Sequence, residues 1–243
     1  MEKEIGNWYA SWFDTPYYHI LYKDRDYEEA ATFMKALTHF LDLPPGAKIL
    51  DLACGKGRHA KYLHQLGYHV TGVDLSPKSI AHAKQFESEH LRFEVHDMCV
   101  PYPEKFDAVF NLFTSFGYFE KEEDNLRTIR AIKSELKKEG FGVIDFLNTE
   151  YISENLVPNE IKTVEGIDFY IHRYIRDGYI FKDIRFADSG ERFFYTERVK
   201  ALTLSDFKSY FNEAGVTLRH CFGDYNLNEF NQRNSDRLIL IFN

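Results

Sequence analysis

The chain contains the run Lys48-Ile49-Leu50-Asp51-Leu52-Ala53-Cys54-Gly55-Lys56-Gly57-Arg58-His59, in which an apolar segment precedes two closely spaced glycines. This pattern predicts a buried strand that ends in a glycine turn and opens into a helix. A second predicted strand, Tyr68–Val73, ends on the acid Asp74. Glycines let a backbone approach a ligand closely, and an acid at the tip of the second strand is placed to bind ribose hydroxyls. The two strands therefore predict a nucleoside site at the carboxyl edge of a parallel sheet.

The spacing of the small residues distinguishes between classes of nucleoside ligand. Ala53, Gly55 and Gly57 alternate, and they do not form the Gly-x-Gly-x-x-Gly pattern of dinucleotide sites. Asp51 lies just before the loop, where an acid is a poor neighbour for a pyrophosphate and a good neighbour for a cation. This arrangement counts against a nicotinamide-dependent dehydrogenase. It favours a nucleoside that carries positive charge and no phosphate.

Four segments resemble the class I S-adenosylmethionine-dependent methyltransferases, whose methyl donor carries an adenosine, an ammonium and a sulfonium. Asp51–Gly57 resembles the first motif of that family, with Ala53 in place of the usual first glycine. Val73-Asp74-Leu75-Ser76 resembles the second motif, whose acid holds the ribose. His96-Asp97-Met98 resembles the third, where an acid meets the adenine amino group, and Phe106–Asn111 resembles the fourth strand.

The resemblance covers roughly residues 46–147 and then the C-terminal strands, and it implies S-adenosylmethionine as the cofactor. It also implies a set of cofactor-binding residues: Tyr17, Tyr22, Arg25, Asp51, Ala53, Gly55, Gly57, Asp74, Leu75, Asp97, Met98 and Asn111. Several of these residues have structural alternatives. The two glycines suit any tight turn after a first strand, and Asp74 precedes a helix start at Ser76-Pro77. Tyr17 and Tyr22 lie at helical spacing and suit burial in a core equally well.

Composition narrows the class of acceptor and the location. Acidic residues outnumber basic ones, 38 against 30, which gives a formal net charge of −8. Because nucleic-acid binding relies on cationic contacts to phosphates, this balance disfavours DNA or RNA. The charged start Met1-Glu2-Lys3-Glu4 is followed by no apolar signal region, and no apolar run approaches the ~20 residues of a membrane helix. We therefore expect a cytoplasmic protein that does not contact a membrane.

The cysteines and histidines give no sign of a metal or a disulfide. Cys54, Cys99 and Cys221 are far apart and lack Cys-x-x-Cys spacing. The ten histidines form no His-x-x-x-His pair with an obvious partner acid. We expect no metal site and no disulfide framework.

Strand and helix patterns alternate up to a fifth predicted strand, Phe141–Phe146, and two further strands are expected near the C-terminus over Val216–Phe222 and Arg237–Phe242. The predicted fold class is α/β, a doubly wound and mostly parallel sheet of seven strands. The resemblance implies the strand order 3-2-1-4-5-7-6. Helical spacing predicts helices over Asp26–Leu41, Gly57–Leu66, Pro77–Glu89 and Glu122–Lys138.

Residues 160–200 follow a different pattern, in which polar and apolar residues alternate. Ile167–Ile175, Tyr179–Ala187 and Arg192–Lys200 predict three antiparallel strands, joined at Asp177-Gly178 and Asp188-Ser189-Gly190. We divide the chain into an N-terminal helical cap over the cofactor (1–45), a cofactor-binding Rossmann-like domain (46–150 and 201–243) and an antiparallel β insertion on the acceptor side (151–200). The insertion can equally form the interface of a homodimer.

The acceptor is expected where the N-terminal segment, the loop 112–119 and the insertion converge, outside the carboxyl ends of the strands. The loop offers the hydroxyls of Thr114, Ser115 and Tyr118, but no acid, lysine or histidine that could act as a base. It lacks the Asn/Asp-Pro-Pro-Tyr/Phe signature of enzymes that methylate nucleobase or glutamine amide nitrogens. His172 in the insertion is a further candidate, but it and Arg173 occupy opposite faces of one predicted strand. No catalytic base is identified.

Three features resemble the amino-sugar N,N-dimethyltransferases of macrolide biosynthesis: Ala53-Cys54-Gly55-x-Gly57-x-His59, the run Phe113–Tyr118, and the tyrosines before Lys23–Tyr27. This resemblance implies that Tyr17 or Tyr22, together with Arg25, caps the methionine end of the cofactor. It also implies that Tyr118 and the insertion border the acceptor. Within the insertion, the candidates for contact with an anionic or sugar acceptor are Tyr170, His172, Arg173, Tyr174, Arg176 and Arg185.

The sequence thus predicts a methyltransferase that acts on a nitrogen or oxygen of a small molecule. Two alternatives stay open. One is a macromolecular methyltransferase that acts on RNA or protein, and the other is a non-catalytic module that binds S-adenosylmethionine.

Overall fold

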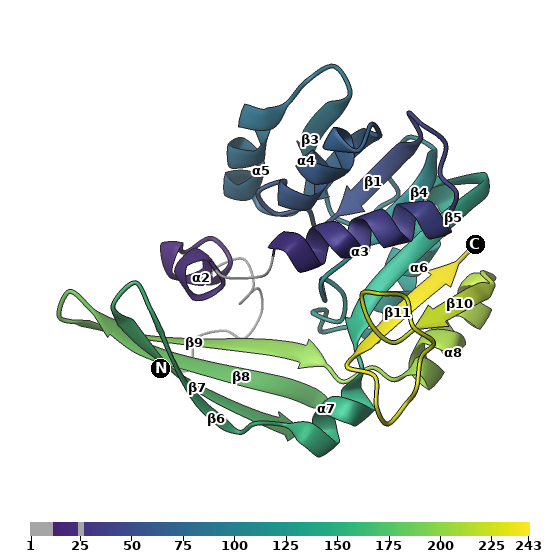
Figure 1. The fold of residues 1–243 in the computed structure, drawn as a ribbon. Coiled ribbons are helices and arrows are strands. Elements are labelled where there is room, and N and C mark those ends of the chain that lie inside the picture. Colours follow the sequence, from purple (N-terminus) through teal and green to yellow (C-terminus); the bar gives the residue numbers. More distant parts are fainter. Residues whose placement is uncertain (1–11, 24–26) are drawn as a thin grey trace.

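The chain folds around two β-sheets, which a computed structural model describes for residues 12–23 and 27–243 (Figure 1). The larger sheet has the order β10-β11-β5-β4-β1-β2-β3. Its strands are β1 (Lys48–Leu52), β2 (His69–Asp74), β3 (Leu91–Val95), β4 (Phe106–Asn111), β5 (Leu136–Leu147), β10 (Leu218–Phe222) and β11 (Arg237–Phe242). β11 pairs antiparallel with β5 and β10, and the other neighbours are parallel. The predicted α/β class and the order 3-2-1-4-5-7-6 are confirmed, because β10 and β11 are the sixth and seventh strands of this sheet along the chain.

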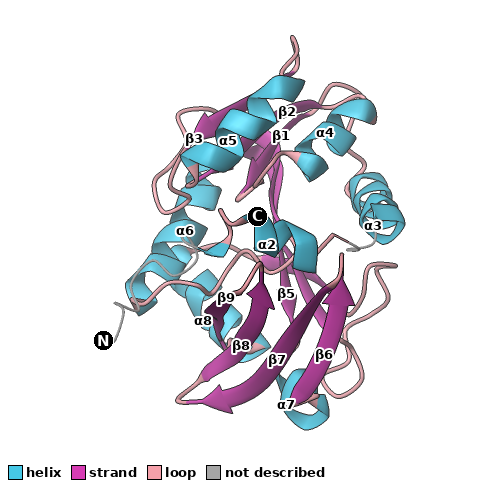
Figure 2. Ribbon diagram, turned by 90° about the vertical axis from the view of Figure 1, so that its left-hand side faces the viewer, coloured by secondary structure: helices cyan, strands magenta, loops and turns pink. Residues whose placement is uncertain are grey.

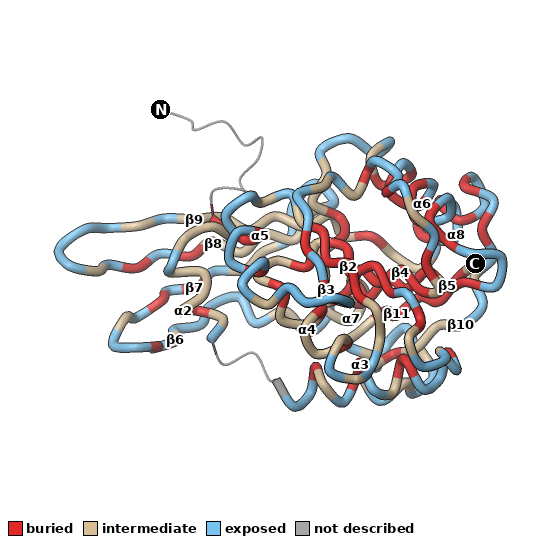
Figure 3. The backbone as a smooth tube through the Cα atoms, turned by 90° about the horizontal axis from the view of Figure 1, so that it is seen from above, coloured by how far each residue is buried: buried red, intermediate tan, exposed pale blue. Residues whose placement is uncertain are grey.

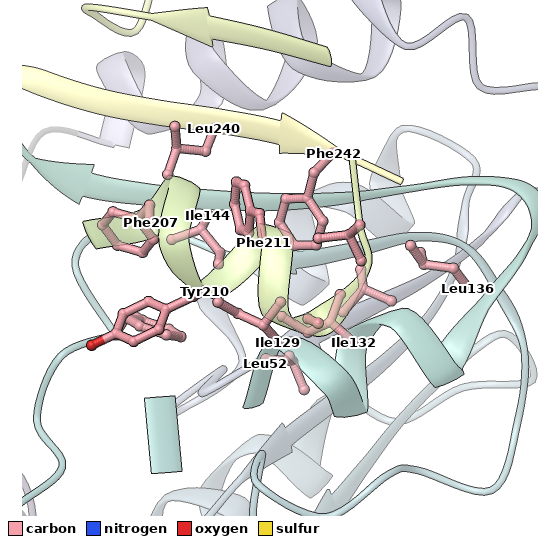
Figure 4. Packing of buried hydrophobic residues seen from close by; sticks show 14 of the residues in the cluster. Leu52, Ile129, Ile132, Leu136, Ile144, Phe207, Tyr210, Phe211, Leu240 and Phe242 are labelled. Atoms are coloured by element: carbon pink, nitrogen blue, oxygen red, sulfur yellow. The ribbon is translucent and has the colours of Figure 1, made fainter. Parts of the chain in front are cut away.

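Helices cover both faces of the seven-stranded sheet. One face packs against α3 (Tyr27–Phe40), α4 (Arg58–Gln65) and α5 (Pro77–Ala83), which continues into the 3₁₀ turn η1 (Lys84–Phe86). The other face packs against α6 (Glu122–Glu135) and α8 (Leu204–Ala214). Successive strand residues serve opposite faces, so that Ile239 lies in the first core and Leu240 in the second. Figure 4 shows the second core, where Phe207 and Phe211 of α8 lie against Leu240 and Phe242 of β11.

Two predicted helices end earlier than expected. The helix predicted over Glu122–Lys138 ends at Glu135, because Leu136 already pairs with Phe106 and begins β5. The helix predicted over Pro77–Glu89 is α-helical only to Ala83.

The insertion forms a separate antiparallel sheet of four strands, which follows the short helix α7 (Thr149–Asn155). The strands are β6 (Asn159–Val164), β7 (Ile167–Arg176), β8 (Tyr179–Asp188) and β9 (Glu191–Lys200). The sequence predicted the last three and missed β6, an edge strand that pairs only with β7 and is mostly exposed. With so little burial, its sequence carries no clear apolar alternation.

Helix α2 (Pro16–Leu21) lies between the two sheets (Figure 2). Its neighbour Trp12 and its own Leu21 are buried against the inner face of the insertion, where they meet Phe169, Ile171 and Phe186. The hairpins of the insertion extend away from the seven-stranded sheet, and much of their length is exposed (Figure 3). Within residues 12–23 and 27–243, no helix is both long and apolar enough to cross a membrane.

The ring of Phe93 on β3 fills a gap that two glycines leave open. A Cβ at Gly57 would lie 2.6 Å from this ring, and a Cβ at Gly72 would lie 2.7 Å from it. The Gly57 Cβ would also approach Ala83 to 3.0 Å. The packing between the glycine loop, β2 and β3 therefore requires glycine at both positions.

We predict that Gly72→Ala lowers the free energy of unfolding by about 1–3 kcal/mol, because the added methyl overpacks against Phe93. Urea denaturation would measure the loss. Phe93→Leu makes room for the methyl, so the double variant is expected to be more stable than the sum of the two single changes allows. Strict additivity of the two losses would contradict this packing.

Candidate functional site

A cavity of about 870 Å³ lies at the carboxyl ends of β1 to β4. The glycine loop, the tips of β2 and β3, and the loop after β4 form its base. Residues of the N-terminal segment and of α3 and α4 complete the wall, and Glu197 reaches it from β9 of the insertion. The cavity is therefore bounded by all three parts of the chain that the sequence placed around a ligand.

Asp51 is a buried carboxyl group at the end of β1 and lines this cavity. Its Oδ2 atom has no hydrogen-bond partner among the described residues. Burial, and then the neighbouring charge of Asp74, raise the pKa of Asp51 to about 7. An unpaired carboxylate in such a position costs free energy until a cation or a donor reaches it.

Asp74 ties the glycine loop to the tip of β2. Its carboxylate accepts the N–H of Gly55 at 2.9 Å and the N–H of Ser76 at 2.8 Å. Burial raises the pKa of Asp74, and the two N–H donors oppose that effect. The side chain lines the cavity with its position fixed by these two bonds.

The three small residues of the loop have different surroundings. A Cβ at Gly55 would meet nothing within 4 Å, and Gly55 lines the cavity. Gly57 does not belong to the lining, because it is the N-cap residue of α4 and packs against Phe93. Ala53 lines the cavity with φ at +60°, a conformation that suits the glycine usual at this position of the family motif better than it suits alanine.

The tips of β2 and β3 form the far end of the cavity. Leu75 is half exposed there, and Asp97 and Met98 also line the wall. Asp97 accepts the N–H of Cys99 at 2.9 Å. Asn111 lies behind the wall, fully buried, with its amide directed to the Leu52 carbonyl at 3.4 Å. Asn111 is thus placed to support the site rather than to line it.

The two tyrosines that were expected to bind the cofactor, Tyr17 and Tyr22, lie in different surroundings. Tyr17 does not line the cavity, because its hydroxyl donates to Asp188 of the insertion at 2.9 Å. Tyr22 does line it, and its hydroxyl donates to Glu197 at 2.6 Å. Arg25 lies outside the described residues.

Glu197 is a residue of the site that the sequence did not single out. It accepts the indole N–H of Trp12 at 2.7 Å and the hydroxyl of Tyr22, and it lies 3.8 Å from the ammonium of Lys182. Its position in an alternating strand resembles that of any surface charge, and its partners Trp12 and Tyr22 lie more than 170 residues away in the sequence. One carboxylate thereby fastens the N-terminal segment to the insertion.

Asp14 and His19 are two more cavity residues that the sequence reasoning missed. Asp14 accepts the hydroxyl of Ser76 at 2.5 Å, which links the N-terminal segment to the tip of β2. Burial, and then the charges of Lys56 and His82, lower the pKa of His19 to about 4. The imidazole of His19 is therefore neutral at pH 7.

The loop after β4 brings Thr114, Ser115 and Tyr118 to the cavity, as the sequence placed them. The hydroxyl of Ser115 donates to the Leu112 carbonyl at 3.0 Å, and that of Tyr118 donates to the Thr114 carbonyl at 2.6 Å. The hydroxyl of Thr114 instead accepts an N–H of Arg237 at 2.9 Å.

His172 does not reach this cavity. It lies in a separate groove of about 530 Å³ on the insertion, together with Tyr170 and Arg185. Its Nδ1 atom lies 3.0 Å from Asn159 and 3.1 Å from the Pro158 carbonyl. In the part of the chain that the structure describes, no group of three or more His, Cys, Asp or Glu side chains could hold a metal ion.

Comparison with known proteins identifies the segment that forms the base of the cavity. Residues 49–140 match a family model described as a methyltransferase domain. The match places a methyltransferase domain in this segment, and the strand order of the sheet agrees with the class I, S-adenosylmethionine-dependent type that the sequence resembles. The unpaired oxygen of Asp51 and the open space at Gly55 fit the ammonium and the close approach of that methyl donor.

Individual relatives of this methyltransferase domain differ in what they act on. A ubiquinone biosynthesis O-methyltransferase of Xanthomonas campestris pv. campestris (strain B100) is 34% identical over 110 residues, 43% of this chain and 44% of that protein. The dTDP-3-amino-3,4,6-trideoxy-alpha-D-glucopyranose N,N-dimethyltransferase of Streptomyces venezuelae is 23% identical over 192 residues, 74% of this chain and 79% of that protein. The first curated relatives are matched over about half of their length, from 44% to 52%.

The fold also has solved relatives. A S-adenosylmethionine-dependent methyltransferase from Clostridium acetobutylicum ATCC 824 superposes with a TM-score of 0.79 at 21% identity. The superposition covers 93% of this chain and 95% of that chain, so the likeness extends over the insertion as well as the methyltransferase domain.

We predict that Asp51→Asn stabilises the free protein at pH 8 by about 2–4 kcal/mol, because a pKa raised from 3.8 to about 7 means that ionisation opposes folding. The opposing effect grows as pH rises through this window, so the advantage of the variant should shrink towards pH 5. Urea denaturation at several pH values measures it. Asp177→Asn, which removes a charge from an exposed turn, serves as the control. An advantage independent of pH would contradict the assignment.

We predict that Glu197→Gln loosens the N-terminal segment and lowers the free energy of unfolding by about 1–3 kcal/mol, because a neutral amide with one acceptor oxygen replaces a charged group with two. In a Trp8→Phe background Trp12 is the only tryptophan, so its fluorescence reports this attachment. The emission should shift to longer wavelength as the indole loses its partner. Glu191→Gln, on the exposed end of the same strand, should leave the emission unchanged.

Proposed function

We propose that the protein transfers the methyl group of S-adenosylmethionine to a nitrogen or oxygen of a small-molecule acceptor. The observation that carries this proposal is the series of three carboxyl groups along the base of the cavity, Asp51, Asp74 and Asp97. They follow the order in which the donor presents its ammonium, ribose hydroxyls and adenine amino group. Tyr22 and Leu75 complete this half of the cavity, and Tyr18 and His19 of the N-terminal segment also line it.

Methyl transfer from a sulfonium is an in-line displacement of an already activated group, so orientation and exclusion of water supply much of the catalysis. The acceptor half of the cavity is enclosed by Phe13, Phe113 and Tyr118, which exclude water. The hydroxyl of Ser115 donates a hydrogen bond to a backbone carbonyl, so its oxygen can still accept a hydrogen bond from an N–H or O–H group of the acceptor. This arrangement suits an amine or an alcohol.

An amino sugar is the first acceptor class to test. The relative from Streptomyces venezuelae acts at a sugar nitrogen, and it matches most of this chain. The sequence resemblance to amino-sugar N,N-dimethyltransferases points in the same direction. The acidic balance of the chain counts against RNA as the acceptor.

We further propose that the outer face of the insertion mediates a homodimer. Ile161, Tyr170 and Phe194 are 63%, 53% and 55% exposed there. Ile161 pairs with Tyr170, and Arg185 of β8 lies between Tyr170 and Phe194 in the same row across the sheet. A cluster of exposed apolar side chains of this kind favours burial against a partner.

Calorimetric titration with S-adenosylmethionine tests the cofactor half. We expect binding to the wild type and at least about tenfold weaker binding to Asp74→Ala, because the loop amides lose their acceptor and the ribose loses its carboxylate. Absence of binding to the wild type, or full affinity in Asp74→Ala, would sink the proposal.

Release of S-adenosylhomocysteine, measured across a panel of amines, alcohols and carboxylic acids that includes amino sugars, tests the transfer itself. Turnover of amines or alcohols is expected. Tight binding without turnover of any acceptor would favour a non-catalytic binding module.

A further inference from the structure

We infer that the buried ion pair between Asp145 and Arg237 positions the acceptor side of the cavity, by holding the turn at Phe113 and Thr114 in a left-handed backbone conformation. Asp145 lies on β5 and Arg237 at the start of β11, away from the glycine loop. The inference rests on the proposed function, because it assigns the loop after β4 to the acceptor.

The starting observation is an unusual backbone. Phe113 and Thr114 are consecutive residues with φ of +57° and +61°, and both line the cavity. An aromatic and a β-branched side chain disfavour this region, which glycine and asparagine tolerate. Such a conformation persists only where the surrounding structure determines it, and residues of this kind cluster at functional sites.

The ion pair supplies the restraints. Asp145 accepts the N–H of Phe113 through its side chain at 2.7 Å and the N–H of Thr114 through its carbonyl at 3.0 Å. Arg237 donates to Asp145 from two nitrogens, at 2.9 Å and 2.7 Å, and donates to the Thr114 hydroxyl at 2.9 Å. Both N–H groups of the turn and its hydroxyl are therefore held by one charged pair.

The pair is enclosed, which keeps its geometry rigid. Asp145 is fully buried, and the side chain of Arg237 is 15% exposed. The ring of Tyr225 covers the guanidinium at 5.3 Å and also lies 5.6 Å from the ring of Phe113. Strong contacts in such surroundings fix the angle at which the turn meets the cavity.

The ion pair affects the acceptor side of the cavity through its contacts with Thr114. The carbonyl of Thr114 accepts the hydroxyl of Tyr118, so the conformation of the turn also sets the place of Tyr118. Asp145 and Arg237 are thus positioning residues that act through Thr114 and Tyr118. None of the bonds of the pair involves Asp51 or Asp74, so the cofactor half should not depend on it.

A matched pair of substitutions at Thr114 tests whether restraint of a strained turn is the role. Thr114→Val and Thr114→Gly both remove the hydroxyl bond to Arg237. Valine keeps the steric cost of a positive φ, and glycine removes it. We expect the amide hydrogens of residues 113 and 114 to exchange about tenfold faster in Thr114→Val and within about threefold of wild type in Thr114→Gly. Equal acceleration in both variants, or none in either, would overturn the inference.

Arg237→Lys tests the pair itself. It keeps the charge but loses the two-nitrogen contact and the bond to Thr114. We expect the same fast exchange at residues 113 and 114 and its reversal in the double variant with Thr114→Gly. Arg219→Lys, an exposed arginine on β10, is the control. Where Arg237→Lys does not fold, as judged by circular dichroism, the two Thr114 variants decide the question.

Titration with S-adenosylmethionine separates this inference from the proposed function. We expect Arg237→Lys to bind the cofactor within about twofold of wild type, while turnover of acceptors that the panel identifies falls about tenfold or more. A matching loss of cofactor affinity would contradict an acceptor-side role. If the wild type does not bind the cofactor, the proposed function fails, whereas the exchange measurements still report on the turn.

Discussion

The cavity depends on one contact, the carboxylate of Asp74 accepting the N–H groups of Gly55 and Ser76. This contact joins the loop after β1 to the tip of β2 and sets the shape of the base of the cavity. It also places a negative charge beside Asp51, whose pKa is raised by burial and by that charge. Asp74 is compensated by two donors, whereas one oxygen of Asp51 has no partner among the residues that the structure describes. A cationic ligand therefore completes the electrostatics of the folded protein rather than merely filling space.

The parallel sheet could be predicted because its strands are buried on both faces and are separated by clear glycine and proline signals. The same reasoning overlooked β6, which as an exposed edge strand shows no such pattern. It could also place Asp51, Asp74 and Asp97 at one sheet edge, because strand ends meet there in any fold of this class. It could not choose between Tyr17 and Tyr22, since helical spacing does not reveal which hydroxyl meets Asp188 and which meets Glu197. Contacts of that kind arise only when distant segments pack together.

Residues 12–23 of the N-terminal segment are attached mainly to the insertion. Trp12, Tyr17 and Tyr22 all bond to side chains of β8 or β9, while the bond from Ser76 to Asp14 connects the segment to the cofactor half. The cavity is thus lined on one side by the seven-stranded sheet and its loops, and on the other by residues 13–23 and Glu197 of the insertion. Figure 2 shows α2 between the two sheets. Because residues 13–23 line the cavity and are bonded to the insertion, changes in the insertion can alter the acceptor half while the base of the cavity stays the same.

The two halves of the cavity share one structural feature, an aspartate on one strand that accepts N–H groups from the loop after the neighbouring strand. Asp74 on β2 holds the Gly55 amide in the loop after β1, and Asp145 on β5 holds the Phe113 and Thr114 amides in the loop after β4. In each case the two strands are neighbours in the sheet. Both loops contain non-glycine residues with positive φ, each of which costs about 1–2 kcal/mol. Hydrogen bonds to a charged acceptor contribute about 1.5–3 kcal/mol each, enough to offset that cost. The charged anchor thus gives each loop a definite geometry, because it holds backbone N–H groups of the strained segment in place. The second anchor carries its own counter-ion, Arg237, while Asp51 beside the first has none among the described side chains. This difference explains why a cationic ligand would stabilise the cofactor half of the cavity rather than the acceptor half.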